Sequence, residues 1–137
     1  MIAPNVLTLE QLNRIALRLP YQEWLGINIT GMDDTGLDIA VPWRDEIVGN
    51  FNQKFMHGAV LAGLIDIGGF LCVLAKKSGT IAGLDMRVDY HRPATQGDHR
   101  IRAEPQKIGK VISTANVEVF DKKDRLIVSG VAAFHSG

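Results

Sequence analysis

The sequence is poor in cysteine and carries no excess charge of either sign. Its 137 residues include one cysteine, Cys72, so a disulfide framework is excluded and a reducing cytoplasm is the predicted location. The 15 lysines and arginines are balanced by 15 aspartates and glutamates. Because phosphate binding needs a basic surplus, this balance argues against a nucleic-acid partner, and it also argues against anchoring to an anionic membrane surface.

The sequence also lacks the common catalytic and nucleotide-binding motifs. It contains no GxSxG, no P-loop and no Rossmann fingerprint. Its four histidines are spread over positions 57, 91, 99 and 135, so neither a metal site nor a metal cofactor is predicted. The first twenty residues lack the charged start and the long apolar segment of a signal peptide.

One long apolar run is present, FMHGAVLAGLIDIGGFLCVLAKK, and it holds a single acidic residue, Asp66. A membrane span needs roughly 20 apolar residues, whereas the run from Ala59 to Ala75 is shorter and contains Asp66 and three glycines. We therefore predict the buried core helix of a soluble protein, from about Gly58 to Lys77, which Gly79 ends.

Shorter elements are predicted on both sides of this helix. Thr8 and Gln11 form a capping-box pattern at the start of an amphipathic helix over 8–19, and Pro20 stops that run. Strands are predicted at 27–32, 37–43, 84–91, 100–108, 110–120 and 126–134, and a loop at 44–55. Pro105 indicates an edge or a bulge in its strand.

Successive hairpins favour an antiparallel sheet, so the predicted fold class is α+β, with the sheet curling around the long helix. The chain shows no internal repeat and no linker. We therefore expect one domain over 1–137, with a helical extension over 1–20.

His57 opens the apolar run, and Asp66 lies nine positions later. At about 100° per residue, the two side chains fall on opposite sides of one helix, roughly 13 Å apart along its axis. They cannot form a hydrogen-bonded dyad within one chain. If both serve one site, that site must be built from two subunits.

Two interpretations of Asp66 fit its surroundings on the helix. Its neighbours on the same face are mostly very small: Ala59, Ala62, Gly63, Gly69, Phe70 and Val73. Either they allow tight packing, with Asp66 bonded to a neighbouring backbone group, or they leave room for a ligand beside a catalytic acid, base or nucleophile. In both cases burial should raise the pKa of Asp66.

Gly58 is predicted to lie in the first turn of the helix, where backbone N–H groups lack partners and the helix dipole is positive. Such an end can hold a developing oxyanion, and glycine permits close approach of a substrate carbonyl. The alternative is that His57 and Gly58 only make a tight entry to the helix.

Taken in order, these residues resemble the hotdog-fold thioesterases. The resemblance rests on His57-Gly58, on Asp66, on the segment GLDMRVDYHRPA, and on Gly109-Lys110 with a closing hairpin, and it covers roughly residues 20–135. The branch that it resembles most is the PaaI-type acyl-CoA thioesterases. This family likeness implies a long helix wrapped by a curved antiparallel sheet, and a homodimer or dimer-of-dimers homotetramer with each active site between two chains.

The resemblance also implies roles for single residues. The catalytic set would be His57, Gly58 and Asp66: the Gly58 N–H of one chain polarises the thioester carbonyl, and Asp66 of the other attacks it or activates a water. The two routes differ in whether an anhydride forms. The substrate would be an acyl-CoA, so no separate cofactor is expected. The implied substrate-binding residues are Asn50, Asn52, Ala59, Phe70, Gly83, Arg92 and Lys110.

Three positions depart from the family pattern. Ala59 stands where a second glycine usually follows His-Gly, and Phe51, flanked by Asn50 and Asn52, stands where an asparagine is common. Gly83 replaces a serine or threonine that helps to position water or substrate. The missing polar groups motivate an alternative, a hotdog protein that binds acyl-CoA without hydrolysing it. A dehydratase or hydratase is disfavoured because its His and carboxylate motifs are not found.

The acyl group is defined only by its apolar surroundings. Candidates for lining its pocket are Phe55, Met56, Phe70 and Leu74, which favour aryl or medium-chain groups over very short polar ones. Arg92 and Lys110 are expected to contact the phosphates of CoA, the alternative being that they are ordinary solvated charges.

Overall fold

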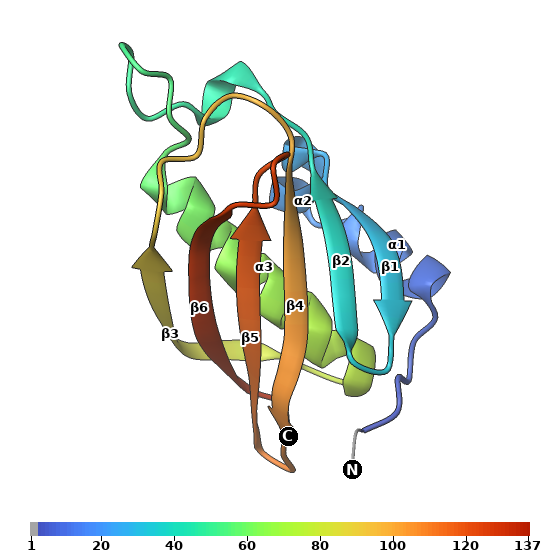
Figure 1. The fold of residues 1–137 in the computed structure, drawn as a ribbon. Helices are drawn as coiled ribbons and strands as arrows, with labels where there is room; N and C mark the ends of the chain where they lie inside the picture. The colour runs from blue at the N-terminus through green and yellow to red at the C-terminus, as the bar shows by residue number, and fades with distance from the viewer. Residues whose placement is uncertain (1–2) are drawn as a thin grey trace.

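The structure is a computed structural model that describes residues 3–137 (Figure 1). The described residues form three α-helices, one short 3-10 helix and six β-strands. In chain order these are α1 (Leu9–Ala16), α2 (Pro20–Leu25), β1 (Asn28–Asp33), β2 (Gly36–Val41), η1 (Asp45–Ile47), α3 (Gly58–Lys76), β3 (Ala82–Tyr90), β4 (His99–Ile108), β5 (Ile112–Phe120) and β6 (Leu126–His135). Each strand predicted from the sequence is present.

The strands of the described chain form one antiparallel sheet in the order β1-β2-β4-β5-β6-β3. Figure 1 shows the sheet curving around α3. The predicted α+β class and the hotdog arrangement, a long helix wrapped by a curved antiparallel sheet, are therefore confirmed. The strand that follows α3, β3, lies at one edge of the sheet, and β1 lies at the other.

The long helix α3 is buried against the sheet through its large apolar side chains and two glycines. Leu64 and Ile65 are fully covered. Gly68 and Gly69 allow the sheet to approach, because a Cβ on Gly68 would lie 2.8 Å from Cγ1 of Val117. Among residues 3–137, α3 is the one helix long and apolar enough to cross a membrane. Its burial makes it instead the core helix that the sequence predicts.

The N-terminal segment agrees with the prediction at its start and differs at its end. Thr8 and Gln11 form the predicted capping box. The helix ends at Ala16, however, and Pro20 begins a second helix, α2, instead of only ending the first. Proline suits this place because its missing N–H would be unpaired in a first helical turn anyway.

The helix α1 covers the β1 edge of the sheet. The Asn13 side chain donates to the carbonyl of Ile29 at 2.9 Å and accepts from the N–H of Ile29 at 2.8 Å. One amide side chain thus takes the place of a neighbouring strand. Leu12 of the same helix is fully buried in the core.

The predicted irregularity at Pro105 is also confirmed. The register of β4 against β5 shifts between Pro105 and Lys107, as expected for a bulge. Pairing of β4 with β2 ends at Ala103, so beyond that residue β4 has a free side. A proline is tolerated where the hydrogen-bonded ladder is already interrupted.

Candidate active site

The start of α3 is capped by the side chain of its own N-cap residue, His57. Its Nδ1 accepts a hydrogen bond from the Ala59 N–H at 2.9 Å, so the neutral ring carries its proton on Nε2. The His57 carbonyl accepts from the Val60 N–H at 3.0 Å. Within residues 3–137, the N–H of Gly58 finds no acceptor. One backbone donor at the positive end of α3 therefore remains free.

Tyr90, at the end of β3, holds this first turn from the other side. Its Oη donates to the Gly58 carbonyl at 2.8 Å. A Cβ placed on Gly58 would lie 3.6 Å from the Tyr90 Oη and 3.7 to 3.8 Å from two carbons of its ring, which are ordinary contacts. Sequence reasoning did not single out Tyr90 for the site. The available signal was its place on the apolar face of the strand just before the segment HRPA.

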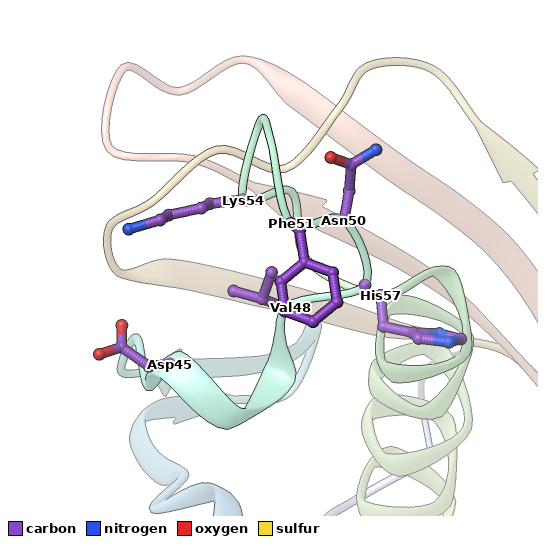
Figure 2. A pocket seen from close by; sticks show the side chains of 7 residues that line it. Asp45, Val48, Asn50, Phe51, Lys54 and His57 are labelled. Atoms are coloured by element: carbon purple, nitrogen blue, oxygen red, sulfur yellow. The ribbon is translucent and has the colours of Figure 1, made fainter.

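The loop that leads into α3 borders two cavities. The smaller has about 170 Å³ and is lined by Gly49, Asn50, Phe55, Met56, His57 and Gly58. The larger has about 470 Å³ and is lined by Asp45, Val48, Gly49, Asn50, Phe51, Lys54 and His57 (Figure 2). Both therefore open beside the helix start. Phe51 at the loop tip is 99% exposed, so its ring adds nothing to the core of the single chain.

The two asparagines of this loop differ in what they do. The Asn50 Oδ1 accepts from the backbone N–H groups of Asn52 and Gln53, each at 2.9 Å, and so stabilises the turn. In Figure 2 the Asn50 amide points away from the His57 ring. Asn52 is exposed and lines neither cavity. The side-chain oxygen of Asn50 is thus already engaged, whereas its amide nitrogen has no acceptor in the described part of the chain.

Asp66 is exposed in the single chain, where the sequence predicts a buried carboxylate. The sheet covers the opposite side of α3, which leaves uncovered the face that carries Asp66. Its carboxylate makes no hydrogen bond or ion pair with any residue in 3–137, so the structural interpretation, a bond to a nearby backbone group, finds no support. Its surroundings are nevertheless apolar enough that burial raises the pKa of Asp66, in the predicted direction.

The Gly58 N–H and the Asp66 carboxylate of one chain cannot both contact the same substrate carbonyl. Gly58 and Asp66 are eight residues apart, which is about 12 Å along a helix. At the same time, β3 is an edge strand with large exposed apolar residues, Leu84, Met86 and Tyr90. A bare edge of this kind is a template for pairing with another strand.

The other candidate residues fall into two places. Arg92 lies just beyond β3 and is exposed at the Gly58 end of the molecule, where the carbonyl of Ala94 accepts from the Met56 N–H at 2.8 Å. Gly83 lies at the opposite end of β3, and a Cβ there would meet nothing within 4 Å. Lys110 lies in the turn between β4 and β5, close to the end of α3.

The residues beside Gly58 and Asp66, and those expected to line the acyl pocket, differ in their exposure and position. Ala59 is exposed beside Gly58, and Phe70 is half-buried one turn beyond Asp66. Of the proposed acyl-pocket residues, Phe55 and Met56 line the smaller cavity, while Leu74 is buried in the core. No group of three or more metal-ligating side chains occurs in the part of the chain that the structure describes.

Comparison with protein families gives a direct match. Residues 53–128, more than half of the chain, match the sequence model of the family described as Thioesterase superfamily. The matched segment contains the free donor of Gly58 and the free carboxylate of Asp66.

Individual relatives agree with this match. The chain is 24% identical over 152 residues to the medium/long-chain acyl-CoA thioesterase YigI of Escherichia coli K12, covering 96% of this chain and 98% of that protein. A crystal structure of a protein from the thioesterase superfamily is 34% identical, with a TM-score of 0.89, covering 93% and 96% of the two chains. The thioesterase HI1161 of Haemophilus influenzae has a TM-score of 0.86 at 23% identity, covering 98% and 94%, a likeness that shows the fold.

Proposed function

Because this chain belongs to the thioesterase superfamily, we propose that it hydrolyses an acyl- or aryl-CoA thioester to the free acid and CoA. The observation that carries the proposal is a pair of unpartnered groups on α3. Among residues 3–137, the N–H of Gly58 finds no acceptor at the helix start, and the Asp66 carboxylate finds no donor in its apolar surroundings. A donor and a base or nucleophile are the two groups that acyl transfer to water requires.

The proposed chemistry uses one group from each of two chains. The Gly58 N–H binds the thioester oxygen and stabilises its developing negative charge. Asp66 of the partner then takes a proton from a water that attacks the carbonyl carbon, and the C–S bond breaks to release CoA. In the other route, the carboxylate itself attacks, CoA leaves as the thiolate, and water hydrolyses the resulting anhydride. His57 positions the donor by capping Ala59 through Nδ1, and its ring is exposed.

We propose that the partner is a second copy of this chain paired along β3. A two-fold axis that brings Gly58 of each chain to Asp66 of the other must pass midway between them, near Ala62. That point lies about 6 Å from the helix start. The Tyr90 side chain is hydrogen-bonded to Gly58, so Tyr90 marks the level of the helix start on β3. Two strand residues span about 7 Å, which is close to the distance from the helix start to the axis. The same axis therefore meets β3 near Val88.

Charge complementarity supports this register. In an antiparallel pair centred on Val88, Arg87 faces the partner's Asp89, and the apolar Met86 faces the partner's Tyr90. A pair centred on Arg87 would instead place like charges opposite each other. The register therefore joins two ion pairs and an apolar strip across one interface. Association of two such dimers into a tetramer is the further step that the family likeness implies.

The proposed substrate-binding residues lie at two opposite ends of the molecule. Arg92 lies at the Gly58 end and suits a phosphate of CoA. Lys110 and Gly83 lie at the end of the molecule opposite Gly58. They therefore contact a substrate only if it extends along the partner subunit. We place the reaction in the cytoplasm, which suits an unpaired Cys72. The assignment to the PaaI-type branch stays a prediction.

The test is hydrolysis of a panel of acetyl-, hexanoyl-, palmitoyl-, phenylacetyl- and benzoyl-CoA, followed by release of free thiol. Cys72 adds no background, because burial raises the pKa of its thiol to about 12. We expect the parent protein to turn over at least one ester, and Asp66→Asn to lower kcat by at least about a hundredfold. Failure of the parent protein to turn over any ester would contradict the proposed hydrolysis, and turnover by Asp66→Asn at the parent rate would make Asp66 structural and remove only its catalytic role.

A second candidate is an acyl-CoA-binding protein without turnover. It is favoured by the engaged oxygen of Asn50 and by Gly83, which carries no hydroxyl. A calorimetric titration separates the two functions. Binding of phenylacetyl-CoA by a parent protein that hydrolyses none of the esters would establish the second.

A further inference from the structure

Two aromatic rings stack on α2, and one of them, Tyr21, lies against α3. Tyr21 and Trp24 both project from α2 and stack, with centroids 6.2 Å apart and 13° between their planes. A Cβ on Gly63 would lie 3.4 Å from both Cε2 and Oη of Tyr21. Gly63 precedes Asp66 by three residues, and such positions on a helix are neighbours, about 5–6 Å apart. The Tyr21 ring therefore lies against α3 one helical turn before Asp66.

The Trp24 ring is held in place by Arg44. The Arg44 guanidinium lies 3.9 Å from the centroid of the Trp24 ring, and it also donates to the Trp24 carbonyl. Glu46 pairs with the same guanidinium at 3.0 Å. A cation over an indole face is a favourable contact. Tyr21 is thus the last member of a stack that is fixed by Arg44.

This stack is not explained by the core of the chain. Tyr21 remains 43% exposed and Trp24 41% exposed. The Tyr21 hydroxyl makes no hydrogen bond within residues 3–137, although burial raises the pKa of Tyr21. Exposed aromatic groups that are held rigidly and placed beside a reactive side chain are typical of ligand contacts.

We propose that Tyr21 is a specificity-determining residue that contacts the acyl group of the thioester, with Trp24 as its support. The proposal rests on the hydrolysis proposed above. The ring supplies a flat apolar surface one helical turn from Asp66, and Gly63, which has no side chain, lets the ring lie close to α3. Such a wall fits an aryl or medium-chain acyl group and blocks a long chain on this side. Its hydroxyl offers one donor to a polar acyl substituent.

The kinetic test compares Tyr21→Ala and Tyr21→Phe on the acyl-CoA panel. We expect Tyr21→Ala to lower kcat/KM for phenylacetyl- and hexanoyl-CoA relative to palmitoyl-CoA on the order of tenfold. Tyr21→Phe keeps the wall and should keep the parent ratios. Leu17→Ala is the matched control, because Leu17 is a 51% exposed apolar residue on the same N-terminal segment. Unchanged ratios in Tyr21→Ala would overturn the proposal, while the hydrolysis itself would stand.

A binding test does not depend on turnover. In an Asp66→Asn, Trp43→Phe background, Trp24 is the single tryptophan of the chain. We expect phenylacetyl-CoA and hexanoyl-CoA to change its emission, and free CoA at the same concentration to leave it unchanged. No change with either ester, or an equal change with free CoA, would place the acyl group elsewhere. Hydrolysis without that emission change therefore refutes only this inference, and the change without hydrolysis refutes only the proposed turnover.

Discussion

At the scale of single residues, Asp66 is a side chain that the folding of one chain does not explain. Ionised groups in apolar surroundings are costly unless hydrogen bonds or charges compensate them. Lys76 on the same helix is compensated, since its Nζ donates to the carbonyls of Ala3 at 2.6 Å and Asp34 at 2.8 Å. Asp66 has no such partner among the described residues. The difference supports a chemical role for Asp66 and a structural role for Lys76.

The raised pKa of Asp66 gives a prediction for pH dependence. A base or nucleophile must be ionised, so kcat/KM should fall as the pH drops through this pKa, with a midpoint above the ordinary value of 3.8. Because the folded-state pKa exceeds the unfolded one, ionisation of Asp66 costs stability as the pH rises through the interval between them. Asp66→Asn should therefore melt at or above the parent temperature at neutral pH while losing activity.

The control for this profile is His57→Asn. Asparagine is a good N-cap residue, so it keeps the capping bond that His57 makes and does not titrate. If Asp66 sets the acidic limb, the limb persists in His57→Asn. If the acidic limb vanishes in His57→Asn, the limb belongs to His57. A lower melting temperature for Asp66→Asn than for the parent would contradict the argument that ionised Asp66 costs stability.

At the scale of secondary structure elements, β3 is the element whose environment is incomplete. Its even-numbered residues 84–90 are apolar and its odd-numbered residues 85–89 are charged, yet both sets are largely exposed. The opposite edge, β1, is closed by the side chain of Asn13. One edge of the same sheet is thus protected, and the other is free to pair.

The proposed pairing along β3 predicts the effect of charge reversal. Arg87→Glu would place two like-charge contacts across the two-fold axis and should raise the dimer Kd on the order of tenfold. The double change Arg87→Glu with Asp89→Arg restores opposite charges and should restore the parent Kd. Sedimentation velocity at several concentrations measures both.

Arg100→Glu is the control for this series. Arg100 pairs with Asp124 of its own chain at 3.2 Å, as Arg87 pairs with Asp89 of its own chain at 3.2 Å, but Arg100 lies on β4, which is not an edge strand. It should leave the Kd unchanged. A double reversal that dissociates as readily as the single one would rule out this register, although it would leave open pairing along another part of β3.

At the scale of the whole molecule, the proposed site exists only in an assembly. One chain presents the Gly58 donor and the Asp66 carboxylate about 12 Å apart along α3. Two-fold symmetry converts this separation into two identical sites, each with one group from each chain. Assembly and activity should therefore be coupled, and dilution below the dimer Kd should abolish both.

Subunit complementation tests this coupling. Asp66→Asn and Gly58→Val should each be inactive, the second because its side chain blocks approach to the N–H. Mixed by unfolding and refolding, they form about half heterodimers, and each heterodimer has one intact site of two. We expect about a quarter of the parent activity in the mixture. Recovery of nothing, with heterodimers verified by mass, would place both groups in one chain.

The sequence by itself determined the features that depend on local pattern. Period-two alternation located the strands, the capping box located α1, and the length and apolarity of one run identified the core helix. The spacing of His57 and Asp66 already indicated that one chain cannot join them. Such features can be predicted locally because side-chain periodicity and capping patterns involve residues that are close together in the sequence.

Only the tertiary structure decided the features that depend on residues distant in sequence. It showed that Asp66 is exposed, that Pro20 begins a helix, and that Gly58 is the donor left free once His57 has capped Ala59. It also brought Tyr90 to Gly58 and Tyr21 to Gly63, over 32 and 42 positions of the sequence. Burial and hydrogen-bond satisfaction are properties of packed surfaces, and a surface does not exist until the sheet has closed around α3.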